Sequence, residues 1–261
     1  MDGPADIPAD PALELQPATS LRRPEPDPWA HRRGEPRTFA AAWIVFLFLL
    51  ALTIMGSLGL AGLVSVEVYR TASRVLLAGV GAGIGIAWPM LRLSQEAPQR
   101  PLAAMAQDIL VVALPAQAVL WPQALPWMAG FPPATLIAVS LSFLAWTLLL
   151  SGILALMLLE LRRRPHLPRW AMMAGIVLLV LGGPCSTALA PPKLPADSRP
   201  ESVDPALLTS PITAPLEALR DRGWSGRPAR ALPEHFVAPA VITLAALPPW
   251  AAAFVRRRRI A

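Results

Sequence analysis

Asp108 is the acidic residue of this sequence that lies well inside an apolar run, and it is the strongest candidate for chemistry. Its run, Leu102–Trp121, is the most polar of the apolar runs because it also holds Gln107 and Gln117, with Pro115 between Asp108 and Gln117. A carboxylate in hydrocarbon costs on the order of 2.5–3.5 kcal/mol on insertion scales. Asp108 must therefore face the interior of a helix bundle and find a partner there, or take up a proton.

Two interpretations of Asp108 follow from that cost. In the first, Asp108 is part of a proton or cation relay, and the two glutamines of its run line the same ion or substrate path. In the second, it forms a static ion pair with a nearby loop arginine such as Arg92 or Arg100. An ion path usually supplies a second ionisable group inside the membrane. The apolar runs hold no other acid well inside them, so we favour the ion pair.

Four glycines at alternate positions form the second feature of interest. Gly79, Gly81, Gly83 and Gly85 make two interleaved GxxxG patterns inside one apolar run. Small residues of this kind let membrane helices approach each other closely, so the four glycines predict a helix-packing face. A nucleotide-binding loop is excluded, because the spacing does not fit G-x-G-x-x-G and no strand precedes the run.

Prolines inside apolar runs predict irregular helices. Pro115 and Pro184 each remove a helical hydrogen bond, and Gly183 loosens the backbone beside Pro184. We therefore expect helix breaks at Pro115 and at Gly183–Pro184. Broken helices line substrate sites in transporters, but a kink near the membrane surface is the simpler interpretation.

The remaining reactive residues do not form a catalytic or metal-binding arrangement. The three histidines, His31, His166 and His235, lie outside the apolar runs or at their edge, and Cys185 is the single cysteine. Intramembrane haem, a metal cluster and an internal disulfide are therefore not expected. We predict a protein without a cofactor or metal that is not an enzyme.

The elements that must position these residues are six apolar runs of 17 to 26 residues. A hydrocarbon core about 30 Å thick needs roughly 20 helical residues, and only helices or closed barrels span it. The sequence thus predicts an all-α, polytopic integral membrane protein with six transmembrane helices. The predicted spans are residues 39–64, 75–91, 102–121, 134–159, 170–190 and 236–255.

The polar segments divide into two tails and one large loop. Residues 1–37 contain eight prolines and seven acids and are expected to be a disordered cytoplasmic tail. Residues 191–234 form an outer loop with nine prolines, in which Pro215–Trp224 has the pattern of two helical turns. That short helix lies on the bundle or membrane surface, or it docks an external partner. Residues 256–261 form a basic cytoplasmic C-terminus.

The distribution of the basic residues predicts the orientation of the chain in the membrane. With both termini inside, the inner segments hold 15 of the 23 basic residues, most clearly Arg162, Arg163 and Arg164 and the run Arg256, Arg257, Arg258 and Arg259. The positive-inside rule therefore favours N-in and C-in. This role accounts for the net charge of +6 without nucleic acid, although arginine runs also attract anionic membrane lipids. The richness in Arg, Ala and Pro is typical of a bacterial protein, hence of a bacterial inner membrane.

These observations exclude more functions than they identify, and no motif identifies a family. We expect a non-catalytic, multi-spanning inner-membrane protein that is a permease-like or scaffolding subunit of a transport or other membrane complex. Its partners would be membrane lipids and other membrane or peripheral subunits, a separate ATPase being one candidate. The first alternative is a self-contained secondary transporter with Asp108 as the coupling group. The second is a membrane enzyme that acts on a lipid-linked substrate.

Overall fold

The computed structural model describes residues 36–60, 62, 65–189, 203–221 and 229–258, and these residues form helices and connecting turns without a strand. Six helical segments are long and apolar enough to cross a membrane, which indicates a multi-pass membrane protein and confirms the predicted all-α class. Most of the predicted tail, residues 1–35, lies outside the described residues. The six segments are α1 (Pro36–Leu60), α2 to α3 (Val66–Ser94), α4 (Pro101–Leu120), α5 (Pro133–Arg163), α6 (Arg169–Leu189) and α9 (Glu234–Arg258).

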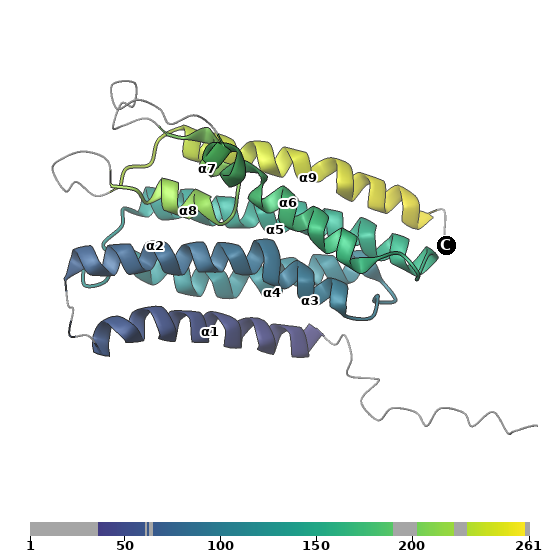
Figure 1. Ribbon diagram of the computed structural model, residues 1–261, viewed down its shortest axis with the longest axis horizontal. Coiled ribbons are helices and arrows are strands. Elements are labelled where there is room, and N and C mark those ends of the chain that lie inside the picture. The colour runs from purple at the N-terminus through teal and green to yellow at the C-terminus, as the bar shows by residue number, and fades with distance from the viewer. Residues whose placement is uncertain (1–35, 61, 63–64, 190–202, 222–228, 259–261) are drawn as a thin grey trace, which may run out of the picture. The chain divides into compact units, whose positions relative to one another are not determined.

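Helix α5 is the centre of the bundle. It packs against α9 on one side and α4 on the other, while α1 packs against α4 and α2 (Figure 1). Its sequence is apolar on all faces, and such a helix is stable only when neighbours surround it. Trp250 on α9 donates a hydrogen bond from Nε1 to the Leu148 carbonyl at 3.0 Å, and Gly152 leaves room for the Trp250 ring. The α5–α9 contact is thus both tight and hydrogen-bonded.

The second long segment begins earlier than the sequence suggested and contains a π-helical turn. The stretch before residue 75, expected to be a loop, is helical from Val66, because the Ser65 hydroxyl caps the first turn by accepting the Val68 amide. Residues Gly83–Ala87 form the π-helical turn that joins α2 to α3 (Trp88–Ser94). Pro89 lacks an amide hydrogen at this point, and the Trp88 amide reaches back five residues to Gly83. The turn rotates all of α3 relative to α2.

The first glycine pair, Gly79 in α2 (Val66–Ala82) and Gly83 in the π-helical turn, packs against α1. A methyl group added at Gly79 would come within 2.9 Å of Leu50, and one at Gly83 within 2.6 Å of Phe46. Larger side chains at these two positions would push α1 away. Because lipid tails are as apolar as the helices, such close approach is what holds membrane helices together.

The second glycine pair faces residues 203–221, which we name the inserted segment. It contains α7 (Pro205–Leu208) and α8 (Thr213–Ala218), and it lies against α2, α5 and α6 (Figure 1). A methyl group at Gly81 would overlap the Pro211 carbonyl, and one at Gly85 would meet the Pro211 ring at 2.9 Å. Gly81 is seven residues beyond Arg74 on α2, which corresponds to about 10 Å along the helix axis at 1.5 Å per residue. The inserted segment therefore reaches between α2, α5 and α6.

The helix expected at Pro215–Trp224 differs in the structure, where α8 spans Thr213–Ala218. Helix α8 ends at Ala218, and Trp224 lies outside the described residues. Leu219, which follows α8, is fully buried, and Glu217 is almost fully buried. The described part of the segment thus packs against the bundle with one side buried, while Leu216, Arg220 and Asp221 stay exposed.

The helix breaks expected at Pro115 and at Gly183–Pro184 are not present in the structure. Helix α4 continues through Pro115, and α6 continues through Gly183 and Pro184. A proline removes only one hydrogen bond of a long helix, and neighbouring side chains can replace part of that loss. In α6 the Ser186 hydroxyl donates to the Gly183 carbonyl at 2.7 Å, whereas the carbonyl that loses its helical donor at Pro184 is that of Val180. Gly183 has a packing role instead, because a methyl group there would overlap Thr209 of the inserted segment.

Candidate functional site

Asp108 lies at the centre of a buried charged cluster between α1, α3 and α4. Its two carboxylate oxygens accept hydrogen bonds from Nε and Nη2 of Arg92, each at 2.5 Å, in a side-on bidentate pair. Nε1 of Trp88 donates a third bond to the carboxylate at 3.3 Å. The Asp108 side chain is fully buried and that of Arg92 is 3% exposed. Both side chains of the ion pair are thus buried.

The rest of the Arg92 guanidinium is also satisfied. Nη1 donates to the Gln95 side-chain oxygen at 3.1 Å, and the guanidinium carbon lies 5.1 Å from the centre of the Phe39 ring. An aromatic face at that distance attracts a cation, and the attraction grows when water is absent. We name Phe39, Trp88, Arg92, Gln95 and Asp108 the buried cluster.

Helix geometry explains why these side chains meet. Trp88 and Arg92 lie four residues apart on α3, so they project from one face toward α4. The π-helical turn just before Trp88 sets the direction of that face. One turn beyond Asp108, Nε1 of Trp43 donates to the Val112 carbonyl at 3.1 Å and fastens α1 to α4. The cluster therefore joins three helices through polar contacts.

This arrangement is suited to holding charge in place. A bidentate arginine–carboxylate pair is among the strongest hydrogen-bonded pairs, and its desolvation is tolerable only when the remaining donors are also satisfied. Here Gln95 and Phe39 meet the remaining side of Arg92. Three cavities lined by described residues do not include Asp108 or Arg92 in their lining. These three cavities thus do not reach the carboxylate, which is fully buried.

The two predicted glutamine partners of Asp108 lie elsewhere. Gln107 is exposed on the surface of α4, turned away from the buried cluster. The Gln117 oxygen accepts a hydrogen bond from the Ser140 hydroxyl at 2.8 Å, which links α4 to α5, while its amide nitrogen is buried without a hydrogen-bond partner. The structure thus does not bring Gln107, Gln117 and Asp108 together. Their role in an ion path stays a prediction.

The predicted topology arginines gather at one end of the bundle, which we name the arginine-rich end. Glu160 in the last turns of α5 pairs with Arg164 at 3.4 Å and with Arg256 of α9 at 3.5 Å. Arginines at helix C-termini also complement the helix dipole. Arg259 lies outside the described residues. The structure shows the clustering, while the side of the membrane on which it lies stays a prediction.

The opposite end, the loop end, is held by a different set of contacts. Arg74 of α2 forms an ion pair with Asp221 and donates to the Leu219 carbonyl at 2.9 Å, which fixes the end of the inserted segment. The buried hydroxyl of Ser73 donates to the Gln123 side chain at 2.6 Å. The loop-end connections are therefore tied to α2.

The sequence alone named Arg92 as one of two candidate partners of Asp108 but missed the rest of the buried cluster. The four-residue spacing of Trp88 and Arg92 is a signal that was present, because it places both on one helical face. Phe39 and Gln95 gave no comparable signal, since their contacts depend on how α1 and the turn after α3 pack.

Comparisons with family models, with curated proteins and with solved structures gave no match to this chain.

Proposed function

We propose that this chain is a non-catalytic, multi-pass protein of a bacterial inner membrane, with both termini in the cytoplasm. In this proposal it is a permease-like or scaffolding subunit that works in a complex with other proteins. The observation that carries the proposal is the closed pair of Arg92 and Asp108, which leaves no free charged group at the centre of the described bundle. A bundle fixed by such a pair suits a subunit that holds or positions its partners.

The exposed helices support the same proposal. Large apolar side chains on α6 and α9 are more than half exposed, including Leu178 at 73% and Leu244 at 64%. Lipid covers such faces in a membrane, and so do the helices of partner subunits. Gln107 lies on the exposed face of α4, and a polar side chain within a membrane helix is stabilised when a neighbouring helix bonds to it.

The test is purification of the chain, tagged at its own locus, in membrane discs that retain native lipid. Intact-mass measurement and peptide identification would then give the stoichiometry. The proposal expects a membrane or nucleotide-hydrolysing protein at a fixed ratio to the tagged chain, also when the tag is moved to that partner. A chain that elutes only as a monomer or homodimer contradicts it.

A second candidate is a secondary transporter with Asp108 as its coupling group. The observation in its favour is that a buried charge is costly inside a membrane and is generally retained for a function. In that case Arg92 would release Asp108 during the transport cycle. The charge-free double variant Arg92→Met/Asp108→Leu separates the two proposals, because a transporter would lose all activity and a scaffold would keep its partners.

A further inference from the structure

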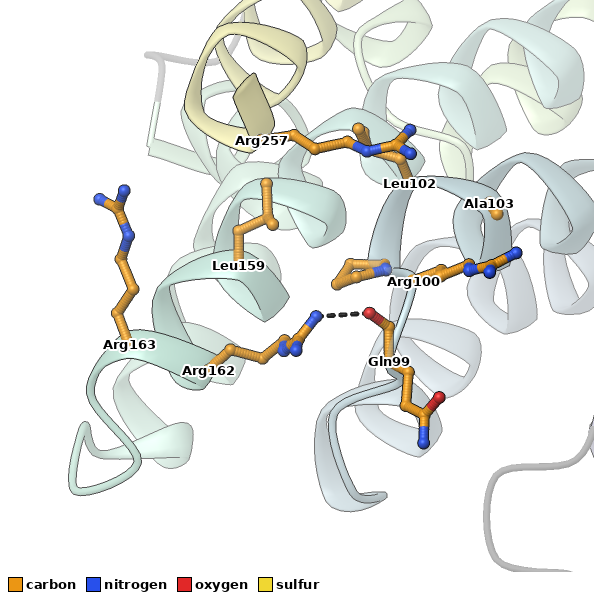
Figure 2. A pocket seen from close by; sticks show the side chains of 9 residues that line it. Gln99, Arg100, Leu102, Ala103, Leu159, Arg162, Arg163 and Arg257 are labelled. Carbon is orange, nitrogen blue, oxygen red and sulfur yellow. Dashed lines mark hydrogen bonds between the residues drawn. The ribbon is translucent and has the colours of Figure 1, made fainter. Parts of the chain in front are cut away.

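A cavity of about 390 Å³ opens at the arginine-rich end, between the ends of α4, α5 and α9 (Figure 2). It does not touch the buried cluster. Arg162 and Arg163 come from the last turn of α5, Arg257 from the last turn of α9, and Arg100 from the residue before α4. Three segments that are far apart in the sequence thus contribute four arginines to the lining of one cavity.

The charge of this cavity is not balanced by its lining. No acidic residue lines it, and within the described chain none of the four arginines forms an ion pair. Glu160, which is close in sequence, is already paired with Arg164 and Arg256. Arginines without an acidic partner that line one cavity attract an anion, since a guanidinium loses little hydration when it binds phosphate.

The start of α4 adds backbone donors to the same site. Pro101 is the first helical residue, and Arg100 provides no side-chain cap. The first internal bond of the helix is donated by the Ala104 amide to the Arg100 carbonyl. The amides of Leu102 and Ala103, which line the cavity, therefore have no acceptor within the helix. Free amides at the positive end of a 20-residue helix are a general feature of phosphate sites.

The directions of the side chains show how an anion would be held. In Figure 2, Arg257 reaches from α9 toward Leu102 at the start of α4. Arg162 turns toward the Gln99 carbonyl and donates a hydrogen bond to it, which positions its guanidinium at the rim. Arg163 points away from these two, and Arg100 extends past the start of α4 away from Arg162, so both contribute charge at a distance.

We propose that this cavity binds a phosphate group, and that the group belongs to an anionic phospholipid. The cavity volume falls within the usual range of small-molecule sites and exceeds what a bare phosphate ion needs. Leu102 and Leu159 line it beside the arginines, so the glycerol part of a lipid would meet apolar side chains. Helix ends that carry arginine lie where headgroups lie, which makes phospholipid the most concentrated source of phosphate.

The test compares two double variants that lose the same charge at the same end of the bundle. Arg100→Gln/Arg257→Gln removes two cavity arginines. Arg164→Gln/Arg258→Gln removes two arginines that do not line the cavity, and it controls for folding and for general surface charge. Delipidated protein in neutral detergent would be titrated with phosphatidylglycerol, with phosphatidylcholine and with inorganic phosphate, and bound species counted by native mass spectrometry.

The proposal expects tighter binding of phosphatidylglycerol than of phosphatidylcholine. The cavity variant should weaken that binding by about tenfold or more, since each arginine near a headgroup contributes about a factor of five, while the control keeps wild-type affinity. Binding of inorganic phosphate with the same dependence on the cavity arginines, without lipid preference, supports the anion site and assigns a soluble phosphate to it. Equal losses in both variants, or no preference for any phosphate-bearing probe, overturns the proposal.

Discussion

Removal of one charge from the buried pair is the sharpest test of how this bundle is held. Asp108→Asn keeps the size of the side chain but leaves the Arg92 guanidinium buried beside a neutral amide. The loss of one partner from a buried ion pair destabilises a protein by about 3–5 kcal/mol, because the other charge stays desolvated. We expect a decrease of that size in the free energy of unfolding.

Glu160 provides the matched control. Glu160→Gln makes the same exchange of a carboxylate for an amide, but its partners Arg164 and Arg256 are 73% and 48% exposed. Exposed pairs contribute about 0–1 kcal/mol, so this variant should be nearly as stable as wild type. The charge-free pair Arg92→Met/Asp108→Leu should regain most of the loss, because apolar replacements of a buried pair are often neutral.

The assay is reversible unfolding in mixed micelles with a rising fraction of sodium dodecyl sulfate, followed by far-UV circular dichroism. Two single variants, Arg92→Met and Asp108→Leu, and their combination give a double-mutant cycle whose coupling energy reports the pair. Each single variant should lose about 3–5 kcal/mol and the combination should regain most of that loss, so we expect a coupling of at least about 4 kcal/mol. The reasoning is refuted if Asp108→Asn is no more harmful than Glu160→Gln, or if the two single losses simply add.

Three further predictions use other contacts. Gly81→Leu should displace the inserted segment and destabilise the fold by about 1–3 kcal/mol, whereas Gly175→Leu, in open space, should be tolerated; the micelle unfolding assay compares them. Trp43→Phe removes the hydrogen bond that the indole adds to the Val112 carbonyl of α4 and should cost about 0.5–1.5 kcal/mol, while Trp146→Phe should cost less because its indole nitrogen has no hydrogen-bond partner. If the two glycine variants destabilise the fold equally, the contact at Gly81 is contradicted. If the two tryptophan variants do so, the contact of Trp43 is contradicted. The C-in orientation predicts that a reporter fused to the C-terminus, of a kind active only in the cytoplasm, is active. Activity of a C-terminal reporter that works only in the periplasm would contradict the C-in orientation.

The six long helices were predictable because their signal is local. Length and apolar composition alone identify a segment such as Pro133–Arg163 as able to span a bilayer. The extension of the second segment back to Val66 was missed, because charged residues near its start resemble a loop when only hydropathy is considered. The continuous helices at Pro115 and Pro184 were missed because a proline's missing bond is visible in the sequence, while its compensation is not.

The site was predictable only in part, for a related reason. The cost of a buried carboxylate requires a partner for Asp108, and the sequence offered two arginines nearby. The π-helical turn decides how α3 is rotated, and that turn depends on Pro89 together with the packing of the glycines before it. The insertion of residues 203–221 likewise depends on a fit between Pro211 and Gly81 that no periodicity reveals.

The most direct test of the proposed function is the ratio of partner to tagged chain, measured by native mass spectrometry for wild type and for Arg92→Met/Asp108→Leu side by side. If the buried pair only holds the bundle of a complex subunit, the same partner should be present at the same fixed ratio in both samples. A wild-type chain without any stoichiometric partner would contradict the proposal.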